Sequence, residues 1–82
     1  MDVRREIRRL RQRRANVRFR ELQSLLEAAG WQRRPGKHSG VFTKAGRRPI
    51  VVPDHPGTLK PGTVSRILED IEADFPSEGG EQ

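Results

Sequence analysis

The sequence contains no cysteine, only two histidines and no long apolar run. Without cysteine, disulfide bonds, zinc sites built on thiolates and thiol nucleophiles are excluded. Two histidines are too few for a typical transition-metal site, so we expect no metal and no other cofactor. No apolar stretch approaches the roughly 18 residues of a membrane span, and no signal-peptide core is visible. We therefore expect a cytoplasmic protein that does not enter the membrane.

What the chain does contain is positive charge. It has 82 residues, enough for one domain with a modest core, and a net charge of +6. Nine arginines lie among the first 20 residues, whereas the segment from Glu69 onward holds six acids and no base. A basic body with an acidic tail favours a polyanionic partner such as a nucleic acid. The alternative is a solvated arginine-rich surface without a partner.

Three segments carry apolar residues at helical spacing. A narrow stripe predicts a helix over residues 2–14, which either docks on the domain or stays mobile and contacts RNA. Stronger stripes predict helices over residues 18–29 and from Lys60-Pro61 to Phe75. Gly30 suits the end of the second helix, and Pro61 suits the start of the third. The stripes consist of Val3, Ile7 and Leu10; Leu22, Leu25, Leu26 and Ala29; and Val64, Ile67, Leu68, Ile71 and Phe75.

Between the second and third helices, turn signals separate three short predicted strands. These strands cover residues 31–34, 38–43 and 48–52. Prolines 49 and 53 bracket the third strand, which favours an edge position. The predicted fold is therefore α+β, an α-β-β-β-α layout like that of double-stranded-RNA-binding domains, with a three-stranded antiparallel sheet packed on two helices. We divide the chain into an arginine-rich helical extension (1–16), a domain (17–75) and a disordered acidic tail (76–82).

Four short motifs occur in a fixed order in the domain. They are Gly30-Trp31 after the second helix, a glycine- and arginine-rich loop with Gly36 and His38, the segment 53–55 (Pro-Asp-His), and the segment 61–63 (Pro-Gly-Thr). In this order they resemble the HicA (YcfA-like) family of bacterial toxins, over about residues 18–72. The sequence departs from the family pattern at two positions. Lys37 replaces a small hydroxyl residue, and Phe42 lies one residue further along the chain than the aromatic residue of the family pattern. The arginine-rich extension lies outside the pattern.

The resemblance implies an mRNA interferase, a toxin ribonuclease that acts on mRNA, and a partner antitoxin of the HicB type that covers its active site. It also places the family's histidine at His38, which we predict to be the catalytic general base. Histidine suits metal-independent RNA cleavage because it titrates near neutral pH. We predict that phosphate is bound by basic residues in and around the same loop and strands. These are Arg33, Arg34, Lys37, Arg47, Arg48 and Lys60.

Other candidate residues allow more than one interpretation. His55 is a secondary candidate, either a general acid, an RNA contact or an ordinary loop residue. Asp54 is interpreted as a turn residue, and Trp31 as a core residue rather than a platform for base stacking. Two other functions stay open: a non-catalytic basic RNA- or DNA-binding module of the same fold, and a protein-interaction subunit whose basic face binds an acidic partner.

Overall fold

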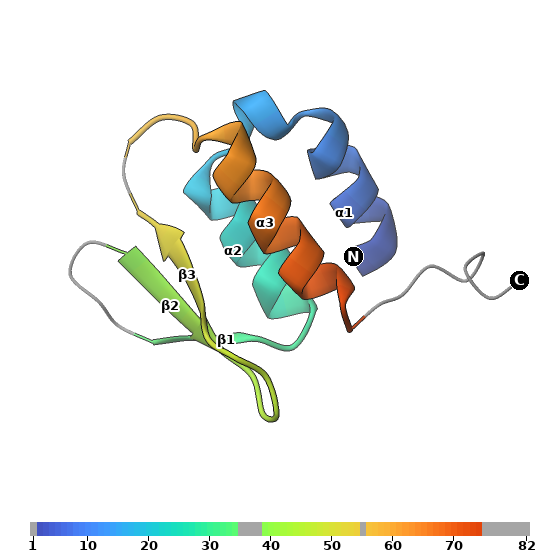
Figure 1. Cartoon of the computed structure of the whole chain (residues 1–82), viewed down its shortest axis with the longest axis vertical. Coiled ribbons are helices and arrows are strands. Elements are labelled where there is room, and N and C mark those ends of the chain that lie inside the picture. Colours follow the sequence, from blue (N-terminus) through green and yellow to red (C-terminus); the bar gives the residue numbers. More distant parts are fainter. Residues whose placement is uncertain (1, 35–38, 55, 75–82) are drawn as a thin grey trace, which may run out of the picture.

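The computed structural model of the chain describes residues 2–34, 39–54 and 56–74. Within them, three helices pack with one three-stranded antiparallel sheet of strand order β1-β2-β3 (Figure 1). The predicted α+β class, the number of strands and their antiparallel pairing are confirmed. In this part of the chain no helix is long and apolar enough to span a membrane.

The N-terminal helix α1 (Val3–Gln12) is docked on the domain. The Asp2 side chain caps it by accepting a hydrogen bond from the Arg5 backbone N–H at 3.3 Å. Its apolar stripe buries Ile7 and Leu10 in the common core. A single 3-10 turn, η1 (Arg14–Asn16), then leads into the next helix. The predicted helix is confirmed, and its contacts show that it docks.

Helix α2 (Phe19–Ala28) buries one face, as its leucine spacing predicted. Gly30 follows it with a φ of 96°, a left-handed conformation that costs glycine little and ends the helix. The next residue, Trp31, is only 3% exposed, so its interpretation as a core residue is confirmed.

The sheet consists of β1 (Gln32–Arg34), β2 (Ser39–Thr43) and β3 (Ile50–Pro53). Its pairing is continuous: Arg34 lies opposite Val41, and Ser39 lies opposite Pro53. Side chains alternate between the two faces of the sheet, so Phe42, Ile50 and Val52 face the helices. β3 lies at an edge, as its flanking prolines predicted.

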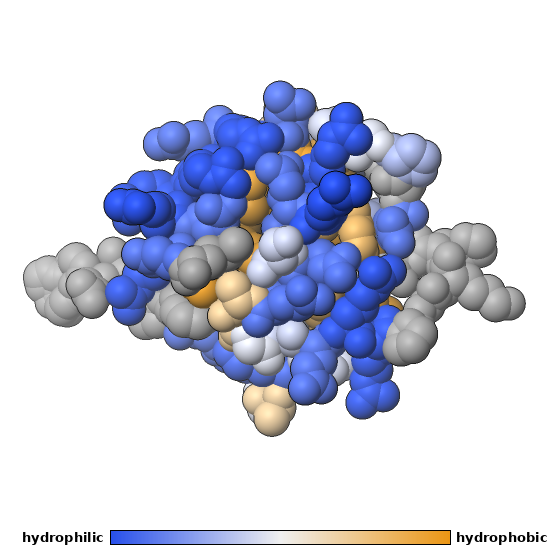
Figure 2. All heavy atoms as spheres, turned by 180° about the vertical axis from the view of Figure 1, so that it is seen from behind, coloured by the Kyte–Doolittle hydropathy of each residue, from blue (hydrophilic) through white to orange (hydrophobic). Residues whose placement is uncertain are grey.

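Helix α3 (Pro61–Glu72) completes the core by packing against α1 and β3. Helices α2 and α3 cover the same face of the sheet, and the other face is left without a helix (Figure 1). Seen from behind, the surface is mostly hydrophilic with small apolar areas among the polar side chains (Figure 2). The buried core is Ile7, Leu10, Val17, Phe19, Leu22, Leu25, Leu26, Ala29, Trp31, Phe42, Ile50, Val52, Leu59, Val64, Ile67, Leu68 and Ile71.

Candidate nucleic-acid interface

One end of the sheet gathers the chain segments that flank both histidines. Ser39, which begins β2, pairs with Pro53, which ends β3. We call this end of the sheet, together with the adjoining start of α2, the loop end. His38, Lys37 and His55 themselves lie outside the described residues, so their predicted roles stay predictions. Their described neighbours nevertheless meet at one place, because antiparallel pairing brings the start of β2 beside the end of β3.

Arg33 is held at the loop end by three different contacts. It lies opposite Phe42 in the sheet and therefore projects toward the helices. Its Nη2 pairs with Asp54 Oδ2 at 3.1 Å, and its Nη1 donates to Gln23 Oε1 at 3.4 Å. The guanidinium carbon also lies 4.9 Å from the centroid of the Phe19 ring, within the range of a cation–π contact. Together these contacts fix the orientation of a side chain that is 32% exposed.

The Phe19 ring can lie there only because residue 40 is glycine. A Cβ atom at Gly40 would lie 2.8 Å from Phe19 Cζ and 3.0 Å from Phe42 Cε1. The centroids of these two rings are 6.3 Å apart and their planes meet at 45°. A close approach of backbone to aromatic rings is one reason for a glycine inside a strand. Gly40 thus lets Phe19 pack directly beside the first residues of β2.

A groove of about 470 Å³ runs along the outside of the loop end. One wall is the first turn of α2, and the other is the segment after β3. An isolated β-bridge between Arg18 and Thr58 joins the two walls. The Leu59 backbone N–H also donates to the Val17 carbonyl at 2.8 Å. The groove is lined by Arg18, Phe19, Arg20, Glu21, Asp54, Pro56 and Gly57.

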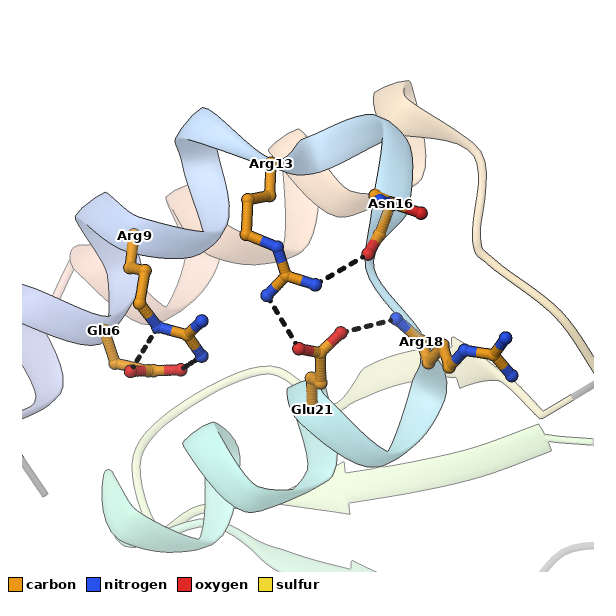
Figure 3. Close-up of polar contacts among 6 residues, drawn as sticks. All are labelled: Glu6, Arg9, Arg13, Asn16, Arg18 and Glu21. Carbon is orange, nitrogen blue, oxygen red and sulfur yellow. Dashed lines mark hydrogen bonds and ion pairs between the residues drawn. The ribbon is translucent and has the colours of Figure 1, made fainter.

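Glu21 anchors the start of α2 to the end of α1 (Figure 3). Its Oε1 accepts from the Arg18 backbone N–H at 3.0 Å, and its Oε2 accepts from Arg13 Nη1 at 2.8 Å. Arg13 also donates to the Asn16 carbonyl at 3.0 Å. Burial raises the pKa of Glu21, but the hydrogen bonds from Arg13 and from the Arg18 backbone outweigh it and leave that pKa below its usual value. Glu21 therefore stays ionised and fixes one wall of the groove.

The neighbouring pair of Glu6 and Arg9 lies within α1 (Figure 3). The hydrogen bond from Arg9 lowers the pKa of the Glu6 carboxyl, although burial acts in the opposite direction. Because this pair joins two residues of one helix, it stabilises α1 locally and does not shape the groove.

The structure separates the predicted phosphate-binding residues. Arg34 follows Arg33 in β1 and therefore projects from the opposite face of the sheet. Lys60 is exposed directly before α3. Arg47 and Arg48 lie in the turn between β2 and β3, at the other end of these strands. We call that turn, with the adjoining part of α3, the hairpin end.

At the hairpin end, the Asp74 carboxylate forms ion pairs with two basic side chains, Lys44 and Arg47. Asp74 Oδ2 lies 3.1 Å from Lys44 Nζ, and Asp74 Oδ1 lies 3.2 Å from Arg47 Nε. Lys44 Nζ also donates to the Ala29 carbonyl at 2.9 Å. These contacts attach the turn to the ends of α2 and α3. Arg48 forms no ion pair with any of the described residues.

No pattern in the sequence predicted the partners of Arg33. Asp54 was interpreted as a turn residue, and its role as an ion-pair partner depends on the strand register across 21 residues of chain. Phe19, the first residue of α2, was not among the residues selected from the sequence. A signal was present in Gly40, since a glycine inside a strand often marks a close approach.

Comparison with known proteins shows the family of the chain. A family model described as HicA toxin of bacterial toxin–antitoxin matches residues 19–73, which is more than half of the chain. The match starts at the first residue of α2 and ends just after α3, so α1 and η1 lie outside it. Neither the search of curated proteins nor that of solved structures finds a match.

Proposed function

Because the chain belongs to the HicA family of toxins from bacterial toxin–antitoxin systems, we propose that it is an endoribonuclease that cleaves mRNA at the loop end. The observation that carries the proposal is the immobilised Arg33. Its guanidinium is fixed by Asp54 and Phe19 while remaining 32% exposed. A fixed, exposed guanidinium next to the chain segment that bears His38 suits a phosphodiester that gains charge during cleavage.

In the proposed reaction His38 is the general base. It takes the proton of a ribose 2′-hydroxyl, and the 2′-oxygen attacks the adjacent phosphorus. The bond from phosphorus to the 5′-oxygen then breaks, which leaves a 2′,3′-cyclic phosphate and a 5′-hydroxyl that receives a proton. His55 is the candidate for donating that proton. The scheme needs no metal ion.

Positive charge at the loop end would bind the RNA backbone. Arg33 would contact the scissile phosphate, while Arg34, Lys37 and Lys60 would contact neighbouring phosphates. Arg47 and Arg48 would contribute only to an RNA long enough to pass along the sheet to the hairpin end. We further propose a fold of the double-stranded-RNA-binding type, the three segments 1–16, 17–75 and 76–82, a location in the cytoplasm and an antitoxin of the HicB type as partner.

The decisive experiment is RNA cleavage by the purified chain in EDTA. Wild type is expected to release products with 2′,3′-cyclic phosphate ends, and His38→Ala is expected to bind RNA but not to cleave it. His55→Ala is the matched control, because it removes the other imidazole and should only slow cleavage. Cleavage by His38→Ala at the wild-type rate would contradict the assignment of the base.

A second arm of the experiment examines the alternative function. The departures at Lys37 and at Phe42 keep open the alternative of a basic RNA- or DNA-binding module that does not cleave. Binding of RNA without cleavage by wild type would select that module. In either case Arg33→Ala should weaken binding and reduce the salt slope of affinity by about one.

A further inference from the structure

A second hollow lies at the hairpin end, away from the proposed cleavage site. It has a volume of about 690 Å³ and is bounded by the β2–β3 turn, the edge strand β3 and α3. Its apolar wall includes Trp31, Ile50 and Ile67. Three arginines also line it: Arg47, Arg48 and Arg66. The combination of an apolar wall with convergent cations is typical of a binding site rather than of a solvated surface.

The Trp31 side chain leaves a hydrogen bond unmade in this wall. Its indole Nε1 is buried and has no acceptor among the described residues. Tryptophan normally finds a partner for this N–H group when it is buried. No other buried side-chain nitrogen or oxygen in the described part of the chain lacks a partner. The atom has almost no accessible surface, so the unmade hydrogen bond is a feature of the core packing beneath the wall and not a contact open to a ligand.

The charges around the hollow are poorly compensated. Arg47 is paired with Asp74, but neither Arg48 nor Arg66 forms an ion pair with a described residue. One carboxylate, that of Asp70, lines the hollow beside the three arginines. Asp74 already shows that a carboxylate can lie between two cations at this end. Guanidinium groups bind carboxylates with matched, charge-assisted hydrogen bonds.

The edge strand supplies a further feature. β3 pairs with β2 on one side only, so its second side carries backbone groups that the sheet does not use. Val51 in this strand is 49% exposed and lines the hollow. It is the one large apolar side chain of the described residues that is exposed. An extended peptide can add to such an edge and place alternate side chains in an adjacent hollow.

We propose that the hairpin end is a docking site for an acidic peptide segment of another protein chain. A carboxylate of the segment binds between Arg48 and Arg66, and a neighbouring apolar side chain packs against the wall near Val51. A peptide fits better than RNA because the wall is apolar and because the cations here lie at the opposite end of β2 and β3 from Asp54, which holds the Arg33 guanidinium. This proposal does not depend on ribonuclease activity.

The chain itself carries a reporter for the test. Trp31 is the only tryptophan and the sequence has no tyrosine. Protein fluorescence excited at 295 nm therefore comes from a residue in the wall of the hollow. The probe is an acetylated peptide of alternating glutamate and valine, and its control carries lysine in place of glutamate. We expect saturable change of Trp31 emission with the acidic peptide and none with the basic one. No change with the acidic peptide would overturn the proposal.

Two variants distinguish this site from general attraction to a basic protein. Arg66→Glu should lower the affinity for the acidic peptide by about tenfold or more, because it replaces a charge-assisted contact by repulsion. Arg8→Glu makes the same charge change on the exposed side of α1 and should leave the affinity within about twofold. Equal weakening by both variants would overturn the proposal.

Single-stranded poly(U) tests whether the hollow binds RNA instead. If poly(U) changes the Trp31 emission in the same way, and if Arg66→Glu weakens the binding of poly(U), the hollow is a nucleic-acid site and the docking proposal is wrong.

Discussion

The two ends of the sheet use the same residue type in different ways. At the loop end, Arg33 is held between a carboxylate and an aromatic ring and keeps part of its surface exposed. At the hairpin end, Asp74 binds Arg47, whereas Arg48 has no ion-pair partner among the described residues. A high count of arginines therefore does not define one continuous binding surface. The partners of each arginine decide what it can bind.

The separation follows from strand topology. Antiparallel strands of five residues or fewer place the start of β2 and its end about 13 Å apart. Arginines of the same segment of sequence, such as Arg34 and Arg48, thus lie at different ends of the sheet or on different faces of it. The two ends can serve two ligands, and the following changes test how independent they are.

The largest effect is expected from Phe42→Ala, which damages both ends at once. Phe42 is fully buried at the centre of the sheet and contacts the Phe19 ring. Its removal should lower the free energy of unfolding by about 3–5 kcal/mol in urea titrations. Val51→Ala, on the other face of the same sheet, is the control and should change it by about 0.5 kcal/mol or less. Similar losses in both variants would contradict the one-sided core.

Gly40→Ala should damage the loop end alone. The new Cβ would lie 2.8 Å from Phe19 Cζ, so the ring must move and Arg33 loses its stacking partner. We expect a loss of about 1–3 kcal/mol in thermal or urea unfolding. Gly62→Ala is the matched control, because nothing lies within 4 Å of its added Cβ and the residue is helical. That control should be neutral or slightly stabilising; a loss equal to that of Gly40→Ala would contradict the steric argument.

Glu21→Gln should reveal a pH-dependent anchor of the loop end. The pKa of Glu21 lies below the usual glutamate value of 4.5, so ionised Glu21 stabilises the fold above that pH. This contribution is lost as the pH falls through the lowered pKa of the folded state. At pH 7 we expect Glu21→Gln to cost roughly 1 kcal/mol. The difference from wild type should shrink in unfolding curves recorded below pH 4.5; a constant difference would contradict the ionic contribution.

The smallest effects on stability are expected from the two partly exposed carboxylates, Asp54 and Asp74. Changing either one to asparagine should cost about 1 kcal/mol or less, since such ion pairs are screened by water and salt. The rate of RNA cleavage should distinguish the two variants. Asp54→Asn loosens Arg33 and should slow cleavage by roughly tenfold, whereas Asp74→Asn should leave the rate unchanged. Equal rates for both variants would show that orientation of Arg33 does not matter.

Much of the fold could be predicted from local patterns in the sequence. Helical spacing of leucine and isoleucine located the three helices, and β-branched residues between turn signals located β2 and β3. Gly30 was correctly predicted to end α2, because its left-handed conformation is a local requirement. The docking of α1 was left open, since its narrow stripe of Ile7 and Leu10 does not reveal what covers it.

The candidate site was harder to predict. Its main polar contacts join residues that only the strand register brings together, such as Arg33 and Asp54, and charge alone grouped Arg33 with Arg48. The family resemblance supplied His38, which no spacing or periodicity would have selected. The unmade hydrogen bond of Trp31 is a property of packing and leaves no trace in the sequence.

The bridge between Arg18 and Thr58 has a consequence for how the protein folds. It closes the chain into a ring that contains α2 and the whole sheet, while α1 and α3 lie outside the ring and join through Arg11 and Glu72, 61 residues apart. The contact between Arg11 and Glu72 closes a longer loop than the bridge does, so it costs more chain entropy. Topologies dominated by distant contacts fold slowly. We expect the ring of local strand pairs to form first, and the two outer helices to join it last.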